Sequence, residues 1–69
     1  MTGPSALQLV DEALAEHRTD EAATERLNML RTAVQVGNPS AIRYRVGLLR
    51  QEGSLLITPL LAYAKSLEA

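Results

Sequence analysis

The 69-residue chain contains no cysteine, phenylalanine or tryptophan, and it has a single histidine. Without cysteine it can form no disulfide, no thiol nucleophile and no cysteine-based zinc site. No apolar run approaches the roughly 20 residues that span a bilayer, because Thr58 and Pro59 interrupt the longest one, Leu55 to Ala64. No basic segment leads into an apolar one at the N-terminus. We therefore expect no signal peptide, no membrane association and a cytoplasmic protein.

Residues suited to catalysis or metal binding are also scarce. His17 is expected at the end of a helix, where a capping or surface role is favoured over that of a general base. The four serines form no recognisable Ser-His-Asp order, and the four glycines are too scattered for a phosphate-binding loop. We therefore expect no enzyme, with no catalytic residue, no metal and no cofactor.

The spacing of apolar residues predicts one small all-α domain over residues 1–69, a compact bundle of three to four short helices. The expected helices cover Ser5 to His17, Glu21 to Val36, Pro39 to Glu52 and Pro59 to Leu67. Their inward stripes are Leu7, Val10 and Leu14, then Ala23, Leu27, Leu30 and Val34, then Ile42, Val46 and Leu49, and finally Leu60, Ala64 and Leu67.

Short polar signals mark the ends of these helices. Asn38-Pro39 and Thr58-Pro59 each read as an N-cap followed by the first helical residue. Gly37 suits the end of the second helix and Gly53 the end of the third. Residues 54–57 are too few for periodicity to decide between a short strand and an extended linker.

Charge is divided along the chain. Residues 1–25 hold six acids and one base, a net charge of −5, whereas residues 26–50 hold five arginines and no acid, a net charge of +5. Residues 51–69 have a net charge of −1. Glu12 and Glu16 stand four residues apart, where like charges on a helix repel each other. A cation that offsets this repulsion would come from the arginine-rich residues 26–50 of the same chain, from a second copy of the chain or from a basic partner. Otherwise, the acidic face is simply exposed to solvent.

The segment from Gly37 to Gly53 carries the clearest functional signal. With Ile42 pointing inward, a helical wheel places a polar, aromatic and basic surface on the opposite side. That surface and its edges consist of Ser40, Arg43, Tyr44, Arg45, Gly47, Arg50 and Gln51. A short helix of this kind after a tight turn suits the DNA major groove, with cations at phosphates and Ser40 and Tyr44 near base edges.

The same segment resembles the recognition helix of helix-turn-helix regulators, of the feast/famine (leucine-responsive) group and related winged-helix repressors. The resemblance lies in the run from Pro39 to Val46, followed by Leu49 and Glu52-Gly53. It implies that DNA is contacted by Ser40, Ala41, Arg43 and Tyr44. The chain departs from that pattern at Leu48, where a polar or basic residue is usual, and after Gly53, where a helix is expected instead of a β-wing.

The favoured function is therefore that of a small transcriptional regulator that binds double-stranded DNA. We expect a homodimer in which the second and third helices form a helix-turn-helix-like corner. The predicted DNA-binding residues are Arg31, Ser40, Ala41, Arg43, Tyr44, Arg45 and Arg50. This function requires that the arginines of the third helix have no acidic partner within the chain.

The alternative is a non-enzymatic protein–protein interaction or assembly module, such as a phage or regulatory adaptor. It would act through its acidic N-terminal helices or through a leucine-rich surface. The predicted interface residues are Leu48, Leu55, Leu56, Leu61 and Tyr63. This function predicts that acids of residues 11–25 pair with the arginines and that an apolar patch stays exposed.

Overall fold

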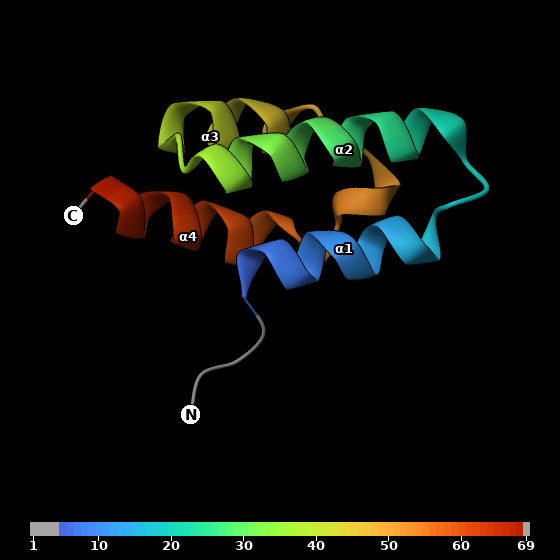
Figure 1. The fold of residues 1–69 in the computed structure, drawn as a ribbon, viewed down its shortest axis with the longest axis horizontal. Helices are drawn as coiled ribbons and strands as arrows, with labels where there is room; N and C mark the ends of the chain where they lie inside the picture. Colours follow the sequence, from blue (N-terminus) through green and yellow to red (C-terminus); the bar gives the residue numbers. More distant parts are fainter. Residues whose placement is uncertain (1–4, 69) are drawn as a thin grey trace.

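Four helices follow one another in the computed structural model, which describes residues 5–68 (Figure 1). They are α1 (Ala6–Glu16), α2 (Glu21–Val36), α3 (Pro39–Gly47) and α4 (Ile57–Glu68), with a short 3-10 helix, η1 (Gln51–Gly53), between the last two. The described part of the chain contains no β-strand, which confirms the predicted all-α bundle and leaves residues 54–56 as a turn. None of its helices is both long and apolar enough to cross a membrane.

The helices pack in chain order around one apolar core. Helix α2 packs against α1 and α3, α3 packs against α4, and α1 makes only slight contact with α4. Figure 1 shows α2 and α3 together above α1 and α4. The largest fully buried side chains are Val10, Leu27, Leu30, Ile42 and Leu60.

The predicted inward stripes are largely confirmed. The four residues expected to face inward from α2 are all buried, and so are Ile42 and Val46 of α3. Three leucines lie partly buried at the margin of the core: Leu7, Leu14 and Leu49. The prediction for Leu67 is wrong, because this side chain near the end of α4 is exposed.

The connection between α2 and α3 has the structure that its residues predict. Gly37 adopts a left-handed conformation with φ of 77°, and its N–H donates to the carbonyls of Ala33 and Val34 at the end of α2. Asn38 Oδ1 then accepts from the N–H of Ala41 at 3.2 Å, and Pro39 is the first residue of α3. These local bonds end one helix and begin the next within two residues.

The predicted end of α3 is wrong, since the helix stops at Gly47 and does not continue to Glu52. Arg50 lies outside both helices with φ of −112° and ψ of −137°, and its N–H donates to Glu52 Oε2 at 2.9 Å. Glu52 is only 7% exposed because the chain turns inward to bring its carboxylate to Arg26 of α2. Gly53 therefore lies in η1 and does not cap α3.

The predicted start of α4 is also wrong. The helix begins at Ile57, so Thr58 lies inside it and is not its N-cap. The N–H of Leu60 donates to the carbonyl of Leu56 at 2.9 Å, which shows that the first turn forms ahead of the predicted cap. Pro59 is tolerated there because the first turn of a helix needs no N–H from that residue.

Candidate functional site

A partly apolar surface lies along the seam between α2 and α3, and we call it the α2–α3 ridge (Met29, Tyr44, Arg45 and Leu48). Tyr44 is 62% exposed and Leu48 is 43% exposed, and Met29 is exposed beside them. Arg45 and Leu48 share a small depression of about 20 Å³ with Arg26 and Met29, which places the two helices' side chains together. The ridge therefore combines apolar, aromatic and cationic groups.

The sequence of α3 explains why these side chains point outward. Ile42 and Val46 are one turn apart and fully or almost fully buried, so residues two positions after each lie on the far side of the helix. Those residues are Tyr44 and Leu48. The guanidinium carbon of Arg45 lies 5.2 Å from the centre of the Tyr44 ring, within reach of a cation–π interaction. This contact orients the ring and the cation relative to each other.

The other predicted DNA-binding arginines lie at different places. Arg31 Nε pairs with Asp11 Oδ1 at 2.6 Å across the α1–α2 seam, and Arg43 Nη2 pairs with Glu68 Oε2 at 2.8 Å across the α3–α4 seam. The hydrogen bond from Arg43 lowers the pKa of Glu68. Arg50 lies beyond the end of α3 and is not on its surface.

The remaining residues of the predicted DNA-binding set are Ser40 and Ala41. Ser40 is exposed, whereas Ala41 is partly buried and packs against the core. Ser40, Arg43, Tyr44 and Arg45 of the predicted set therefore have accessible side chains on α3, with Arg43 paired to Glu68 and Arg45 partly buried.

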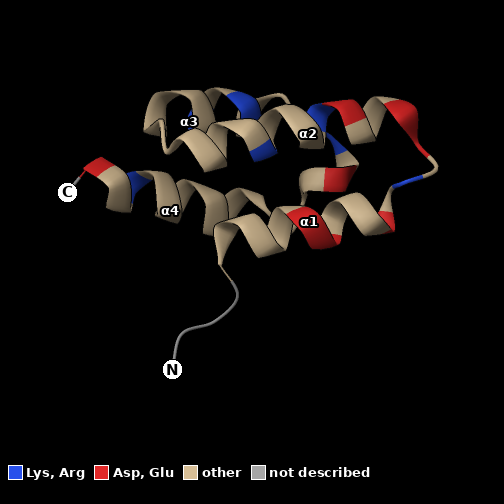
Figure 2. Ribbon diagram, in the orientation of Figure 1, with Lys and Arg blue, Asp and Glu red and all other residues tan. Residues whose placement is uncertain are grey.

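Neither of the two predicted charge arrangements is met in full. Among residues 5–68, Arg43 of α3 has an acidic partner and Arg45 has none. Of the acids in residues 11–25, only Asp11 forms an ion pair with an arginine. Exposed pairs of this kind contribute little to stability. Figure 2 shows most of the acids over α1 and the start of α2, further acids at η1 and the end of α4, and most arginines over the rest of α2 and α3.

The five predicted interface residues do not form one surface. Leu56 is buried in the core, and Tyr63 packs against it, so neither offers an exposed face of the kind expected. Leu48 belongs to the α2–α3 ridge, Leu61 is exposed on α4, and Leu55 lies in the turn that follows η1. The exposed leucines are thus divided among three places.

An ion pair between Arg26 and Glu52 is the main feature that the sequence did not indicate. Arg26 Nε and Nη2 bind the two Glu52 carboxylate oxygens at 2.6 and 3.0 Å. The hydrogen bond from Arg26 lowers the pKa of Glu52 to about 2, against the opposing effect of burial. Because the partners are 26 residues apart, no local pattern connects them. The pair fixes η1 against α2 and thereby shapes one end of the ridge.

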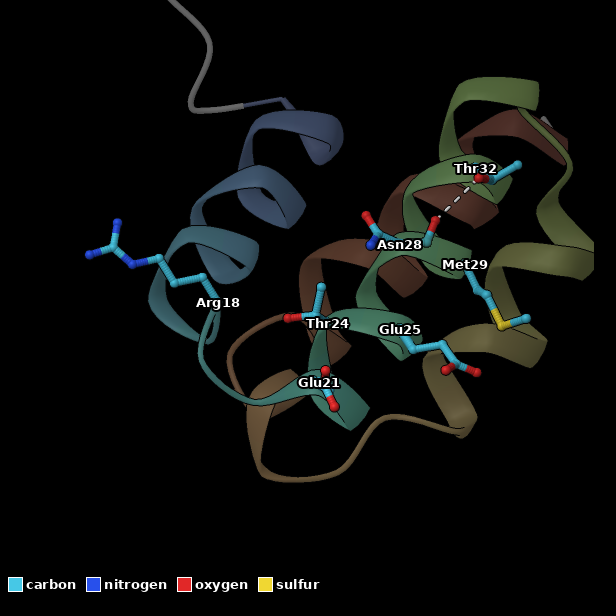
Figure 3. Close-up of a pocket in the computed structure, with 7 residues that line it drawn as sticks. All are labelled: Arg18, Glu21, Thr24, Glu25, Asn28, Met29 and Thr32. Atoms are coloured by element: carbon cyan, nitrogen blue, oxygen red, sulfur yellow. Dashed lines mark hydrogen bonds between the residues drawn. The ribbon is translucent and has the colours of Figure 1, made fainter.

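The outer face of α2 has a shallow hollow of about 420 Å³ (Figure 3). Two of its hydroxyls are already used by the backbone: Thr24 donates to the His17 carbonyl at 3.1 Å, and Thr32 donates to the Asn28 carbonyl at 3.2 Å. Figure 3 shows Arg18 pointing away from the other side chains. The hollow therefore has no converging polar groups and is not a candidate site.

Within residues 5–68, no three His, Asp or Glu side chains gather to hold a metal ion. Comparison with protein-family models, with curated proteins and with solved structures found no match for this chain. Function must therefore be inferred from the α2–α3 ridge and from the distribution of charge.

Proposed function

We propose that this chain is a non-enzymatic protein–protein interaction module that binds its partner through the α2–α3 ridge. The observation that supports this proposal is the exposure of Met29, Tyr44 and Leu48 together, next to the cation of Arg45. Methionine, tyrosine and arginine are enriched at protein interfaces, and tyrosine and arginine are frequent among the residues that dominate binding energy. A contiguous exposed apolar surface commonly marks an interaction site.

The ridge also indicates the chemistry of the partner. Tyr44 and Leu48 need an apolar surface opposite them, and Arg45 needs an acceptor because it has no carboxylate partner within residues 5–68. The partner surface therefore combines apolar side chains with an aspartate or glutamate. A few exposed side chains are fewer than the 20–30 residues a side of a standard interface, so we expect affinity in the micromolar range.

A peptide-display selection tests this proposal even though the partner is unidentified. Random peptides are selected on the immobilised protein, and the enriched ones are titrated by fluorescence anisotropy. We expect sequences that combine apolar residues with Asp or Glu. Leu48→Ser should weaken their binding about tenfold, the effect of losing a central contact of roughly 1.4 kcal/mol.

Leu61→Ser is the matched control, because Leu61 is a leucine on α4 with a similar exposed fraction, 38% against 43% for Leu48. It should leave peptide binding unchanged. The proposal is overturned if no peptide is enriched, or if Leu61→Ser weakens binding as much as Leu48→Ser does. Circular dichroism of both variants establishes that each is folded.

DNA binding by a small regulator is a second candidate, favoured by one observation. Ser40 lies in the first turn of α3 after its Asn38 cap, and Tyr44 and Arg45 follow on the accessible surface of the same helix. These positions include Ser40 and Tyr44, which the helix-turn-helix resemblance assigns to DNA contacts. Arg31 and Arg43 are held by acids, however, and the acidic residues of α1 would repel phosphates (Figure 2).

Anisotropy of labelled random-sequence duplex DNA, at about 50 and 200 mM salt, decides between the two candidates. Micromolar binding that falls steeply with salt and is lost in folded Arg43→Ala/Arg45→Ala would establish DNA binding. Absence of binding at the lower salt concentration would exclude DNA recognition by this chain alone.

A further inference from the structure

A groove of about 270 Å³ lies between α1 and the turn that follows η1, and we call it the α1 groove. Leu9, Glu12, Glu16 and Leu55 are the lining residues that the argument uses. Leu55 is 85% exposed, the largest exposure among the large apolar side chains of the described residues. Buried Ala13 and Leu56 also line the groove. The polar side chains of Gln51 and Ser54 line it too, so the groove offers a partly apolar concave surface with the carboxylates of Glu12 and Glu16 at its edge.

Two of the three carboxylates that line this groove lack a cation, whereas the third, Glu52, is paired with Arg26. Asp11, the preceding acid on α1, is paired with Arg31, but Glu12 and Glu16 have no ion pair within residues 5–68. They are one turn apart on α1, a spacing at which like charges destabilise a helix by a few tenths of a kcal/mol. A cation from outside the chain would remove this repulsion.

We propose that a second copy of this chain fills the α1 groove with its α2–α3 ridge, so that copies associate head to tail. The inference rests on the proposed function and names the partner of the ridge. Arg45 would meet Glu12 and Glu16, while Tyr44 and Leu48 would cover Leu9 and Leu55. Each copy has both the ridge and the groove, which makes the contact heterologous and able to repeat.

The distribution of charge and of exposed apolar side chains supports a second copy as the occupant. The ridge has an unpaired cation beside exposed apolar side chains, and the groove has unpaired carboxylates beside the exposed side chain of Leu55. Glu25 lies next to Met29 at the α2 side of the ridge (Figure 3). Its charge would be repelled by the groove, so this end of the ridge stays outside the contact.

Sedimentation velocity over about 5–500 µM protein, at about 50 and 300 mM salt, tests the inference. We expect the weight-average sedimentation coefficient to rise with concentration at the lower salt and to rise much less at the higher salt. A monomer at every concentration would overturn the inference. The proposed function would still be decided separately, because the peptide selection does not require self-association.

Charge-reversal variants test which surfaces meet. Arg45→Glu and Glu12→Arg/Glu16→Arg should each sediment as monomers, and an equimolar mixture should associate again because opposite charges face each other in it. Lys65→Glu makes the same charge change on the exposed surface of α4 and should associate like the wild type. Association that survives either variant, or a mixture that remains monomeric, would overturn the inference; circular dichroism establishes that every variant is folded.

Discussion

The two connections on either side of α3 are built by different interactions. Between α2 and α3, Gly37 and Asn38 end and begin helices through hydrogen bonds to residues at most five positions away. Between α3 and α4, the chain is held by Glu52, whose carboxylate reaches Arg26 at a separation of 26 residues. The structure of the first connection can be predicted from its own residues. The structure of the second can be predicted only when the packing of the helices is known.

Glycine shows the same contrast. Gly37 is needed for its own backbone conformation, with a φ of 77° that side chains disfavour. Gly53 has no such requirement, but a Cβ on it would collide with the side chain of Leu49. The two glycines look alike in the sequence, yet one serves a turn and the other serves a close contact between neighbouring segments.

Glu52→Gln should produce the largest effect, because it removes the charge of a buried carboxylate and leaves the partly buried Arg26 without its charged partner. We expect the free energy of unfolding to fall by about 3 kcal/mol, at the lower end for breaking a buried pair since Arg26 keeps some contact with water. Urea denaturation monitored by circular dichroism measures it. Glu68→Gln, which removes the exposed partner of Arg43, should have a much smaller effect. Equal losses would mean that the second connection does not depend on this pair.

Acid should destabilise the protein through the same carboxylate. The pKa of Glu52 is about 2 in the folded chain, below the ordinary glutamate value of about 4.3. The unfolded chain therefore binds the proton more readily, so this contribution to stability is complete above about pH 4.5 and is lost as the pH falls toward 2. Urea denaturation between pH 6 and 2.5 should show a steeper loss for the wild type than for Glu52→Gln. Parallel curves would contradict this assignment.

Gly53→Ala should destabilise the protein by about 1–3 kcal/mol, the usual cost of forcing a methyl group into a filled space. Gly47→Ala is the matched change, since nothing lies within 4 Å of a Cβ at that position. It should raise stability by about 0.5–1 kcal/mol, because alanine is the better helix former. Thermal melts of the two variants should move in opposite directions. A shift of Gly53→Ala toward higher temperature would show that Leu49 can move aside.

Asn38→Ala should lower stability by about 1 kcal/mol, since Asn38 Oδ1 no longer accepts from the Ala41 N–H at the start of α3. Asn28→Ala, at an exposed position within α2, is the control and should be neutral or slightly stabilising. Denaturant midpoints give both values. If Asn38→Ala changed stability no more than Asn28→Ala, the connection between α2 and α3 would depend on packing, as the connection between α3 and α4 does.

Part of the candidate site could be predicted from the sequence of α3, and part depends on how the helices pack. The outward positions of Tyr44 and Leu48 follow from helical periodicity around Ile42 and Val46. The place of Met29 beside Leu48 does not, because it depends on how α2 and α3 pack. The ion-pair partners of Arg31 and Arg43 could not be identified from local sequence either, since these acids lie on other helices.

The sequence by itself determined the all-α class, the bounds of α2, the turn at Gly37 and Asn38 and most of the core. These follow from periodicity and from hydrogen bonds between near neighbours. Tertiary structure alone decided where α3 ends, which arginines are paired and which leucines stay exposed. In those cases the deciding interactions join distant parts of the chain, which a local sequence pattern does not report. Among the ion pairs, only the one with the buried carboxylate, Arg26–Glu52, is expected to exceed the small local helix preferences in energy.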